Sequence, residues 1–247
     1  MISIVVPAFN ESENIYKLIT DLKQSLDKVS EITYEIVIVD DGSTDATFDN
    51  LVSLHNQDPQ INYIKLSQNF GSHAAIMAGL SRCTGDAAII MAADLQDPPQ
   101  VIESLVKQWK AGYQVVWACR ETREGEPWYV TLPSKFYYLS MNAISSVKQF
   151  PKGADFFLIS RDALDKLTQI SISNTSIFML VAWLNFKQTS LTYVKKPRHA
   201  GKSKWTLSKK IKLFLDSITS FSGKDIEKRF KSSSENPGFH IAKSSLD

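Results

Sequence analysis

The stretch Ile89-Ile90-Met91-Ala92-Ala93-Asp94-Leu95-Gln96-Asp97-Pro98-Pro99 decides how the rest of the chain is arranged. Its apolar start, Ala87 to Met91, is long enough for a buried strand and too short for a helix. Asp97 has the side chain of a helix N-cap, and Pro98 suits the first helical position. The stretch therefore predicts a strand, then a turn that carries carboxylates, then a helix.

Asp94 and Gln96 lie at the carboxyl end of this predicted strand, which is where open α/β sheets bind their ligands. Hard oxygen ligands on a short turn suit Mg²⁺ or Mn²⁺ that accompanies a diphosphate. From this stretch alone a second interpretation stays open, in which Asp94 and Asp97 serve only as turn and cap residues.

The composition is that of a soluble globular protein, because 43% of the 247 residues are hydrophobic and 22% are charged. This length suits one large α/β domain or two small ones. Cys83 and Cys119 are too few for a disulfide framework, which is compatible with a reducing compartment. The chain begins directly with the strand-like run Ile2–Val6, so we expect no secretory signal. No run approaches the roughly 18 apolar residues of a membrane span.

Strand-like segments alternate with helical ones along the first half of the chain. The predicted strands are Ile2–Val6, Glu35–Val39, Tyr63–Leu66, Ala87–Met91 and Gln114–Ala118. One-sided apolar stripes predict helices after the first strand (Ile15, Leu18, Ile19, Leu22, Leu26) and after Asp97 (Val101, Ile102, Leu105, Val106, Trp109). This alternation predicts the α/β class, with a mostly parallel sheet covered by helices on both faces.

Two further strand ends carry polar side chains. One is Asn10-Glu11 after the first strand, and the other is Asp40-Asp41-Gly42-Ser43-Thr44-Asp45 after the second. Gly42 permits a sharp turn, and carboxylates beside it can accept hydrogen bonds from a base N–H or ribose hydroxyls. Turn chemistry explains Asp45 better, and Ser43 is a candidate helix cap. His73 is interpreted as a helix-start residue rather than a base.

Two common nucleotide-binding motifs do not occur in the sequence. The first strand is not followed by GxGxxG, which disfavours a dinucleotide-binding Rossmann site. GxxxxGK[ST] is also missing, which argues against a P-loop NTPase.

Four motifs occur in register: Pro7 to Glu11, Val39 to Asp45, Asn69-Phe70-Gly71 and Ala93 to Pro99. Together they make the chain, as far as Ser222, resemble glycosyltransferase family 2, the inverting enzymes with a GT-A fold. Within the family it is similar to the transferases that use dolichol or undecaprenyl phosphate as acceptor. The resemblance implies a GT-A (Rossmann-like) sheet, a nucleotide-sugar donor and Mg²⁺ or Mn²⁺.

The resemblance also implies roles for individual residues. Asp94 and Gln96 occupy the metal-binding positions, and Asp41 occupies the position that reads the base or ribose. The implied nucleotide-sugar positions are Pro7, Ala8, Asn10, Glu11, Asp41, Ala93, Asp94, Lys202 and Lys204.

The chain departs from the family pattern at three positions. Ala92 stands where the family usually has the first Asp of the metal motif, which predicts weaker metal binding or coordination completed by water and phosphate. Gln68 and Phe157 stand where relatives often have Arg. The change at Gln68 removes one charge partner for the nucleotide phosphates.

The implied acceptor-phosphate residues are Arg120, Arg123, Ser134, Lys135 and Arg198. Guanidinium groups suit this role because they bind phosphate oxygens bidentately. An exposed charged loop is the alternative for the mixed Arg/Glu segment that follows Arg120. Asp155 corresponds to the family's acid near the reacting centre. A phosphate acceptor is already ionised near neutral pH, so Asp155 would orient substrates, whereas a sugar hydroxyl acceptor would need it as base.

The segment from Lys195 to Lys212 carries eight basic residues and no acid. Lys202 and Lys204 match the family's flexible loop over the diphosphate. Residues 206–222 predict a basic amphipathic helix suited to an anionic membrane surface. An ordinary solvated face is the second interpretation, and nucleic acid ranks last because no nucleic-acid-binding module is recognisable.

These observations predict a GT-A domain over residues 1–205, with a nucleotide-sugar half at about 1–118 and an acceptor half at about 119–205. After this domain we expect the amphipathic helix at 206–222 and then a disordered tail at 223–247. The expected function is metal-dependent hexose transfer from a UDP-sugar to a polyprenyl phosphate, peripherally at the cytoplasmic membrane face. A homo-oligomer is compatible with the sequence. The alternatives are transfer to a sugar hydroxyl of a polysaccharide and a degenerate protein that binds the donor without turnover.

Overall fold

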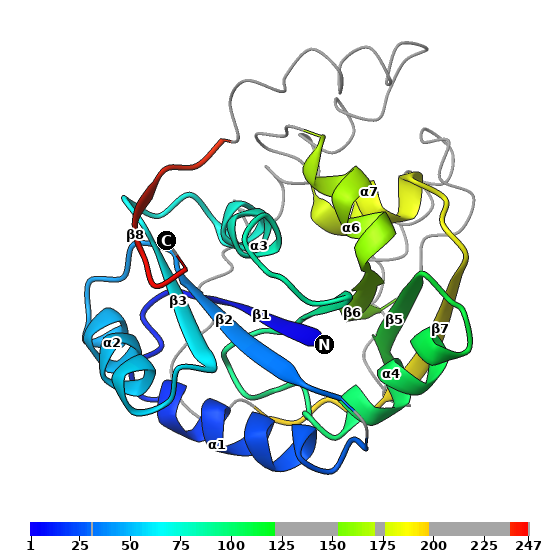
Figure 1. Cartoon of the computed structure of the whole chain (residues 1–247), viewed down its shortest axis with the longest axis horizontal. Helices are drawn as coiled ribbons and strands as arrows, with labels where there is room; N and C mark the ends of the chain where they lie inside the picture. Colours follow the sequence, from blue (N-terminus) through cyan, green and yellow to red (C-terminus); the bar gives the residue numbers. More distant parts are fainter. Residues whose placement is uncertain (31, 122–152, 171–175, 198–237, 247) are drawn as a thin grey trace, which may run out of the picture.

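The computed structural model describes residues 1–30, 32–121, 153–170, 176–197 and 238–246 of the chain. These residues form one eight-stranded sheet in the order β7-β5-β6-β4-β1-β2-β3-β8 (Figure 1). The strands are β1 (Ile2–Ala8), β2 (Tyr34–Asp40), β3 (Ile61–Leu66), β4 (Ala87–Ile90), β5 (Val115–Arg120), β6 (Ala154–Ser160), β7 (Gln188–Tyr193) and β8 (Ile241–Ser244). All five strands expected from the sequence are confirmed, and most of the sheet is parallel.

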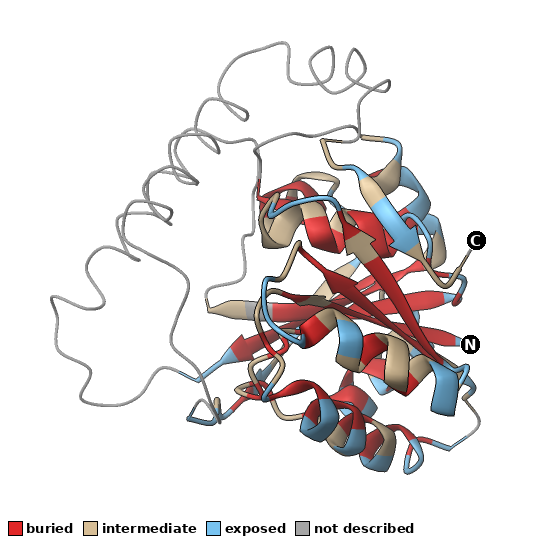
Figure 2. Ribbon diagram, turned by 90° about the vertical axis from the view of Figure 1, so that its left-hand side faces the viewer, coloured by how far each residue is buried: buried red, intermediate tan, exposed pale blue. Residues whose placement is uncertain are grey.

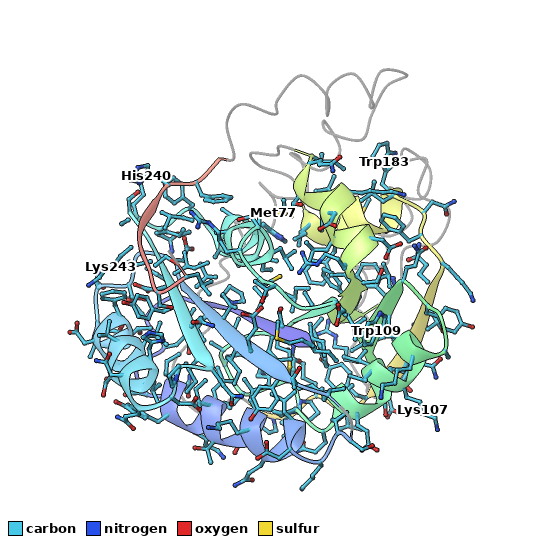
Figure 3. All side chains as sticks on the ribbon, in the orientation of Figure 1. Met77, Lys107, Trp109, Trp183, His240 and Lys243 are labelled. Carbon is cyan, nitrogen blue, oxygen red and sulfur yellow. The ribbon has the colours of Figure 1, made fainter. Side chains whose placement is uncertain are left out.

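Helices cover both faces of the sheet, as the alternating pattern predicted (Figure 1). They are α1 (Ile15–Leu26), α2 (Thr47–Gln57), α3 (Ser72–Leu80), α4 (Val101–Lys110), α6 (Arg161–Thr168) and α7 (Ile177–Trp183). One apolar cluster packs beneath α3, α6 and α7, and the other beneath α1, α2 and α4. Met77 of α3 packs on the first cluster and Trp109 of α4 on the second (Figure 3). The inner strands between them are almost wholly buried, whereas the edge strands β7 and β8 are partly exposed (Figure 2).

The strand order reverses between β1 and β4. From β1 the chain proceeds outward to β2 and β3, and it then returns to place β4 on the other side of β1. Ile4 of β1 is accordingly paired in parallel with Ile36 of β2 and with Ile89 of β4. Such a reversal leaves a crevice outside the carboxyl ends of the two strands, where α/β sheets bind ligands.

The last strand corrects one expectation. The sequence predicted disorder for 223–247, but within that tail β8 pairs antiparallel with the edge strand β3. Ser245 holds this edge through its backbone N–H, 3.0 Å from the Tyr63 carbonyl oxygen. Phe239, Ile241 and Leu246 pack against the core, and Lys243 lies beside β3 (Figure 3). The tail is polar on average, so its composition predicted disorder. Three spaced apolar residues in it are nevertheless enough to hold a short strand against an open sheet edge.

Candidate active site

The loops after β1 and β2 are joined by hydrogen bonds at the carboxyl edge of the sheet. The Asn10 backbone N–H donates to Ser43 Oγ at 2.8 Å, and Asn10 Oδ1 accepts from the Thr44 N–H at 2.8 Å. Asn10 has φ +53°, a left-handed conformation that Asn tolerates better than most residues. Ser43 therefore ties two loops together and is not a helix cap, because α2 begins at Thr47 with Ala46 at its N-cap.

Glu11 is nearly buried, and both its backbone N–H and its carboxylate form hydrogen bonds. Its backbone N–H donates to Thr47 Oγ1 at 2.9 Å, and its carboxylate accepts from Asn14 Nδ2 at 2.6 Å. Asp45 accepts from the Ser12 and Thr47 backbone N–H groups. Burial tends to raise the pKa of Asp45, but its hydrogen bonds with Thr47, including one from the Thr47 hydroxyl, and with Ser12 outweigh burial and hold the pKa below its ordinary value. The structure thus gives Asp45 the turn role expected from sequence.

Pro7 and Ala8 form the end of β1, and Ala8 contributes through its backbone. The side chain of Ala8 is buried, whereas its carbonyl oxygen accepts from the Asp41 N–H at 2.8 Å. Ala93, another residue implied to bind the nucleotide sugar, also has its side chain in the core. A ligand that approaches the chain at these two positions would therefore contact small side chains and the backbone.

Asp41 and Gly42 fasten the β2 loop to the loop after β3. The two carboxylate oxygens of Asp41 accept from the backbone N–H groups of Phe70, at 2.7 Å, and Gly71, at 2.9 Å. Gly42 has φ +70°, and a Cβ there would lie 2.4 Å from the Gln68 carbonyl carbon. Only glycine fits this conformation and this approach. Asp41 thus already performs a structural task beside the base- or ribose-reading role implied for it.

The turn after β4 presents its polar side chains on one side. Burial alternates along it, with Ala92, Asp94 and Gln96 partly exposed and Ala93, Leu95 and Asp97 buried. Asp94 Oδ1 accepts from the Gln96 N–H at 3.2 Å, and Leu95 has φ +60°. The implied metal residues Asp94 and Gln96 therefore share the accessible side of the turn, next to the crevice between β1 and β4.

Asp97 does not cap α4, contrary to the sequence prediction. The helix begins at Val101 with Gln100 at its N-cap, and the Val101 N–H bonds to the Pro98 carbonyl oxygen. Asp97 instead points into the core. Its Oδ1 accepts from the Tyr193 hydroxyl at 2.5 Å and lies 3.3 Å from Lys195 Nζ. Sequence reasoning missed these partners because they lie at the end of β7 and just after it, about a hundred residues away, and no local pattern links them to the turn.

The half of the chain that the sequence predicted to bind the acceptor is described only in part. Arg120 ends β5 as an exposed residue, and its backbone N–H donates to the Gly153 carbonyl oxygen at 2.9 Å. Because β6 runs antiparallel to β4, with Phe157 opposite Ile90, the backbone of Asp155 lies at the carboxyl edge. Outside the described residues lie Arg123, Ser134, Lys135, Arg198, Lys202, Lys204 and the helix predicted at 206–222.

His73 lies in the first turn of α3, where the sequence placed it. Its Nδ1 accepts from the Ile177 backbone N–H at 3.4 Å, and its ring packs edge-on against Phe178 of α7. Loss of hydration lowers the pKa of His73 to about 4, so the ring is neutral at pH 7. It joins two helices on one face of the sheet.

The donor atoms at the turn fit a divalent cation that is shared with a diphosphate. Mg²⁺ is typically held by one or two carboxylates together with substrate phosphates and water. Asp94 supplies one carboxylate, and Gln96 directs Nε2 to the Lys196 carbonyl oxygen at 3.3 Å, which leaves Oε1 as an acceptor. Among the described residues there is no cluster of three or more His, Cys, Asp or Glu side chains that would hold a metal unaided.

The order of the strands, the crevice and the polar loops define a GT-A glycosyltransferase. The chain belongs to glycosyl transferase family 2, whose model matches residues 3–168. An uncharacterized glycosyltransferase of Synechocystis, sll0501, is 37% identical over 221 residues, which cover 90% of this chain and 69% of the relative. The bactoprenol glucosyl transferase of Shigella phage SfX is 35% identical over 90% of this chain and 72% of the relative.

Solved structures support the same fold. Glucosyl-3-phosphoglycerate synthase of Mycobacterium tuberculosis, crystallised with Mn²⁺, UDP-glucose and phosphoglyceric acid, is similar with a TM-score of 0.56. The two sequences are 20% identical, and the match covers 87% of this chain and 76% of the other. Within the described part of the chain, no helix has the length and apolar character needed to cross a bilayer.

Proposed function

We propose that this glycosyltransferase moves a hexose from a UDP-sugar, with glucose favoured, to a polyprenyl phosphate at the cytoplasmic face of a membrane. The observation that carries the proposal is the placement of Asp94 and Gln96 on the accessible side of a turn at the strand-order reversal. The name of the bactoprenol glucosyl transferases, about 35% identical over 90% of this chain, supports the acceptor class. The ligands of the mycobacterial synthase support UDP-glucose and a divalent cation.

The residues divide the chemistry between them. Asp94 and Gln96 would hold Mg²⁺ or Mn²⁺, whose charge offsets that of the departing diphosphate. Asp41, Asn10 and Glu11 would border the nucleotide. An oxygen of the lipid phosphate would attack the anomeric carbon in line, the bond to the UDP oxygen would break, and the configuration would invert. Because the attacking phosphate is already ionised, the reaction needs no general base, and Asp155 would orient a substrate.

The basic segment supports a membrane location for the reaction. Lys202, Lys204 and Arg198 would meet phosphate groups, and Arg120, Arg123, Ser134 and Lys135 would bind the lipid phosphate. The basic helix predicted at 206–222 would keep the protein at the surface that holds its acceptor.

The test is transfer of labelled sugar from a panel of UDP- and GDP-sugars to a short-chain polyprenyl phosphate, with Mn²⁺, with Mg²⁺ and with a chelator. We expect a lipid product from one donor, lost with the chelator and reduced at least 100-fold in Asp94→Ala. The control is Asp21→Asn, which changes a half-buried carboxylate on α1 that pairs with Lys17 one helical turn earlier, far from the turn after β4.

Other products would decide between the remaining functions. Transfer to a glycan and not to the lipid would replace the proposal with hydroxyl transfer, in which Asp155 serves as base. UDP binding without transfer to either acceptor would favour the degenerate interpretation. Recovery of turnover in Ala92→Asp would then identify the missing carboxylate as its cause.

A further inference from the structure

The carboxylate turn is held by a segment that begins with the last residue of β7. We call residues 193–196 the strap. Tyr193 ends β7, and its ring packs edge-on against Phe156 of β6, with the ring centroids 5.2 Å apart. From there its hydroxyl reaches Asp97 Oδ1 at 2.5 Å. The tyrosine thus passes from an outer strand to the turn after β4 through the core, where only a long side chain with a polar end could make the link.

Lys195 adds a charge to the same carboxylate oxygen. Its Nζ lies 3.3 Å from Asp97 Oδ1, and the Asp97 side chain is 1% exposed. A carboxylate withdrawn this far from water is costly unless it is paired and hydrogen-bonded. Tyr193 and Lys195 together offset the cost of burying the Asp97 carboxylate. Asp97, held in this way, fixes the carboxyl end of the loop after β4.

A second link joins the strap to the turn through the backbone. The Lys196 N–H donates to the Gln96 carbonyl oxygen at 2.8 Å, and Gln96 Nε2 donates to the Lys196 carbonyl oxygen at 3.3 Å. Both bonds are made by Gln96. The residue before it, Leu95, has a left-handed φ of +60°, which is costly for a leucine. The contacts of Gln96 and Asp97 with the strap, directly after Leu95, therefore hold the turn in this conformation.

We propose that Tyr193, Lys195 and Asp97 are positioning residues for the turn that carries Asp94 and Gln96. The proposal rests on the proposed function, because the positioned groups are those that would meet the cation and the diphosphate. None of the three residues touches the reacting atoms in this assignment. Partners that orient metal-binding groups typically change metal affinity roughly 10- to 100-fold when they are removed.

The test compares Tyr193→Phe with a matched control at the other end of the sheet. Tyr34 also donates its hydroxyl to an aspartate, Asp27 Oδ1 at 3.1 Å, but it does so at the start of β2. In the full chain, UDP binding is measured by calorimetry at increasing Mn²⁺. We expect Tyr193→Phe to raise the Mn²⁺ concentration for half-maximal UDP binding roughly 10-fold, and Tyr34→Phe to leave it unchanged.

A second pair of variants tests the charge. Lys195→Gln removes the cation beside Asp97, and Lys23→Gln removes the one beside Asp58 on the opposite edge. We expect the Mn²⁺ requirement to rise several-fold in the first variant only. Equal Mn²⁺ requirements in Tyr193→Phe, Lys195→Gln and the wild type would overturn the proposal, provided that the wild type binds UDP.

Hydrogen exchange separates this proposal from the proposed function. Without any ligand, amide exchange in residues 92–97 should become at least 10-fold faster in Tyr193→Phe and stay unchanged in Tyr34→Phe. A wild type that binds no UDP would refute the proposed function, and faster exchange would still support the positioning role. Unchanged exchange in the turn would overturn the positioning role, whatever the outcome for UDP.

Discussion

The two sides of the crevice are held together in different ways. On the β1–β2–β3 side, loops bind one another across short sequence separations, 33 residues for Asn10 with Ser43 and 29 for Asp41 with Phe70. The turn after β4 is held by partners much farther along the chain, 96 residues from Asp97 to Tyr193. The first side can assemble once three strands have formed. The second requires β7, so its geometry depends on residues much later in the chain.

The different ways in which the two sides are held indicate where the chain tolerates substitutions. The close backbone approach at Gly42 and the buried Asp41 carboxylate hold the first side together, so small alterations there should lower the free energy of unfolding. The second side depends on side chains that cross the core, so alterations should shift the turn while the fold persists. Predictions that measure folding and ligand binding separately can test this contrast.

The largest effect is expected for Gly42→Ala on the first side. A Cβ would lie 2.4 Å from the Gln68 carbonyl carbon and 2.7 Å from the Asn69 nitrogen, both backbone atoms, and φ is +70°. We expect the free energy of unfolding to fall by about 3 kcal/mol or more, since overpacking adds to left-handed strain. Urea unfolding monitored by circular dichroism measures it.

Gly112→Ala is the matched control, because Gly112 also has a positive φ, +91°, but the nearest atom to a Cβ is Lys187 Nζ at 3.7 Å. That variant should lose only the roughly 1–2 kcal/mol that left-handed strain costs. Equal losses in the two variants would show that the contact between Gly42 and Gln68 contributes nothing.

A smaller effect is expected for Asp41→Asn. The two Asp41 oxygens accept from the Phe70 and Gly71 N–H groups, and an asparagine can accept only one of these bonds. We expect a loss of about 1–3 kcal/mol in unfolding free energy. UDP affinity should fall as well, because the loops after β2 and β3 separate.

Asp49→Asn on α2 is the control for this change, since Asp49 is an exposed carboxylate. Because Asp49 lies in the first turn of α2, the variant should lose no more than about 1 kcal/mol of unfolding free energy and keep its UDP affinity. Normal stability of Asp41→Asn combined with lost UDP affinity would mean that Asp41 acts on the nucleotide alone and does not join the loops.

The same contrast explains which features the sequence could predict. Short apolar runs and one-sided stripes predicted the five strands and the helices α1 and α4, because strand and helix periods are local properties. The polar ends of β1, β2 and β4 were likewise visible as motifs. Asp97 was wrongly assigned as a cap because a carboxylate followed by proline resembles a helix N-cap in the local sequence. In the structure its carboxylate binds Tyr193 and Lys195 instead. β8 was missed because three apolar residues in a polar tail give almost no periodic signal.

His73 gives the last and smallest prediction, at the contact between α3 and α7. It follows Gly71 on α3 and accepts from the Ile177 N–H of α7. Its pKa is about 4 in the folded protein and about 6.5 when unfolded, so the unfolded chain binds the proton more readily between these values. Stability should be full above about pH 6.5 and fall as the pH is lowered toward 4.

At pH 5 this amounts to at most about 2 kcal/mol of lost unfolding free energy relative to pH 7. His73→Gln keeps a hydrogen-bond acceptor for Ile177 without a proton to gain, so the difference between pH 5 and pH 7 should shrink by up to that amount. His55→Gln on α2 controls for loss of an imidazole elsewhere. If urea unfolding shows the same pH difference in wild type and His73→Gln, the acid sensitivity arises from other groups, and His73 joins the helices without coupling them to pH.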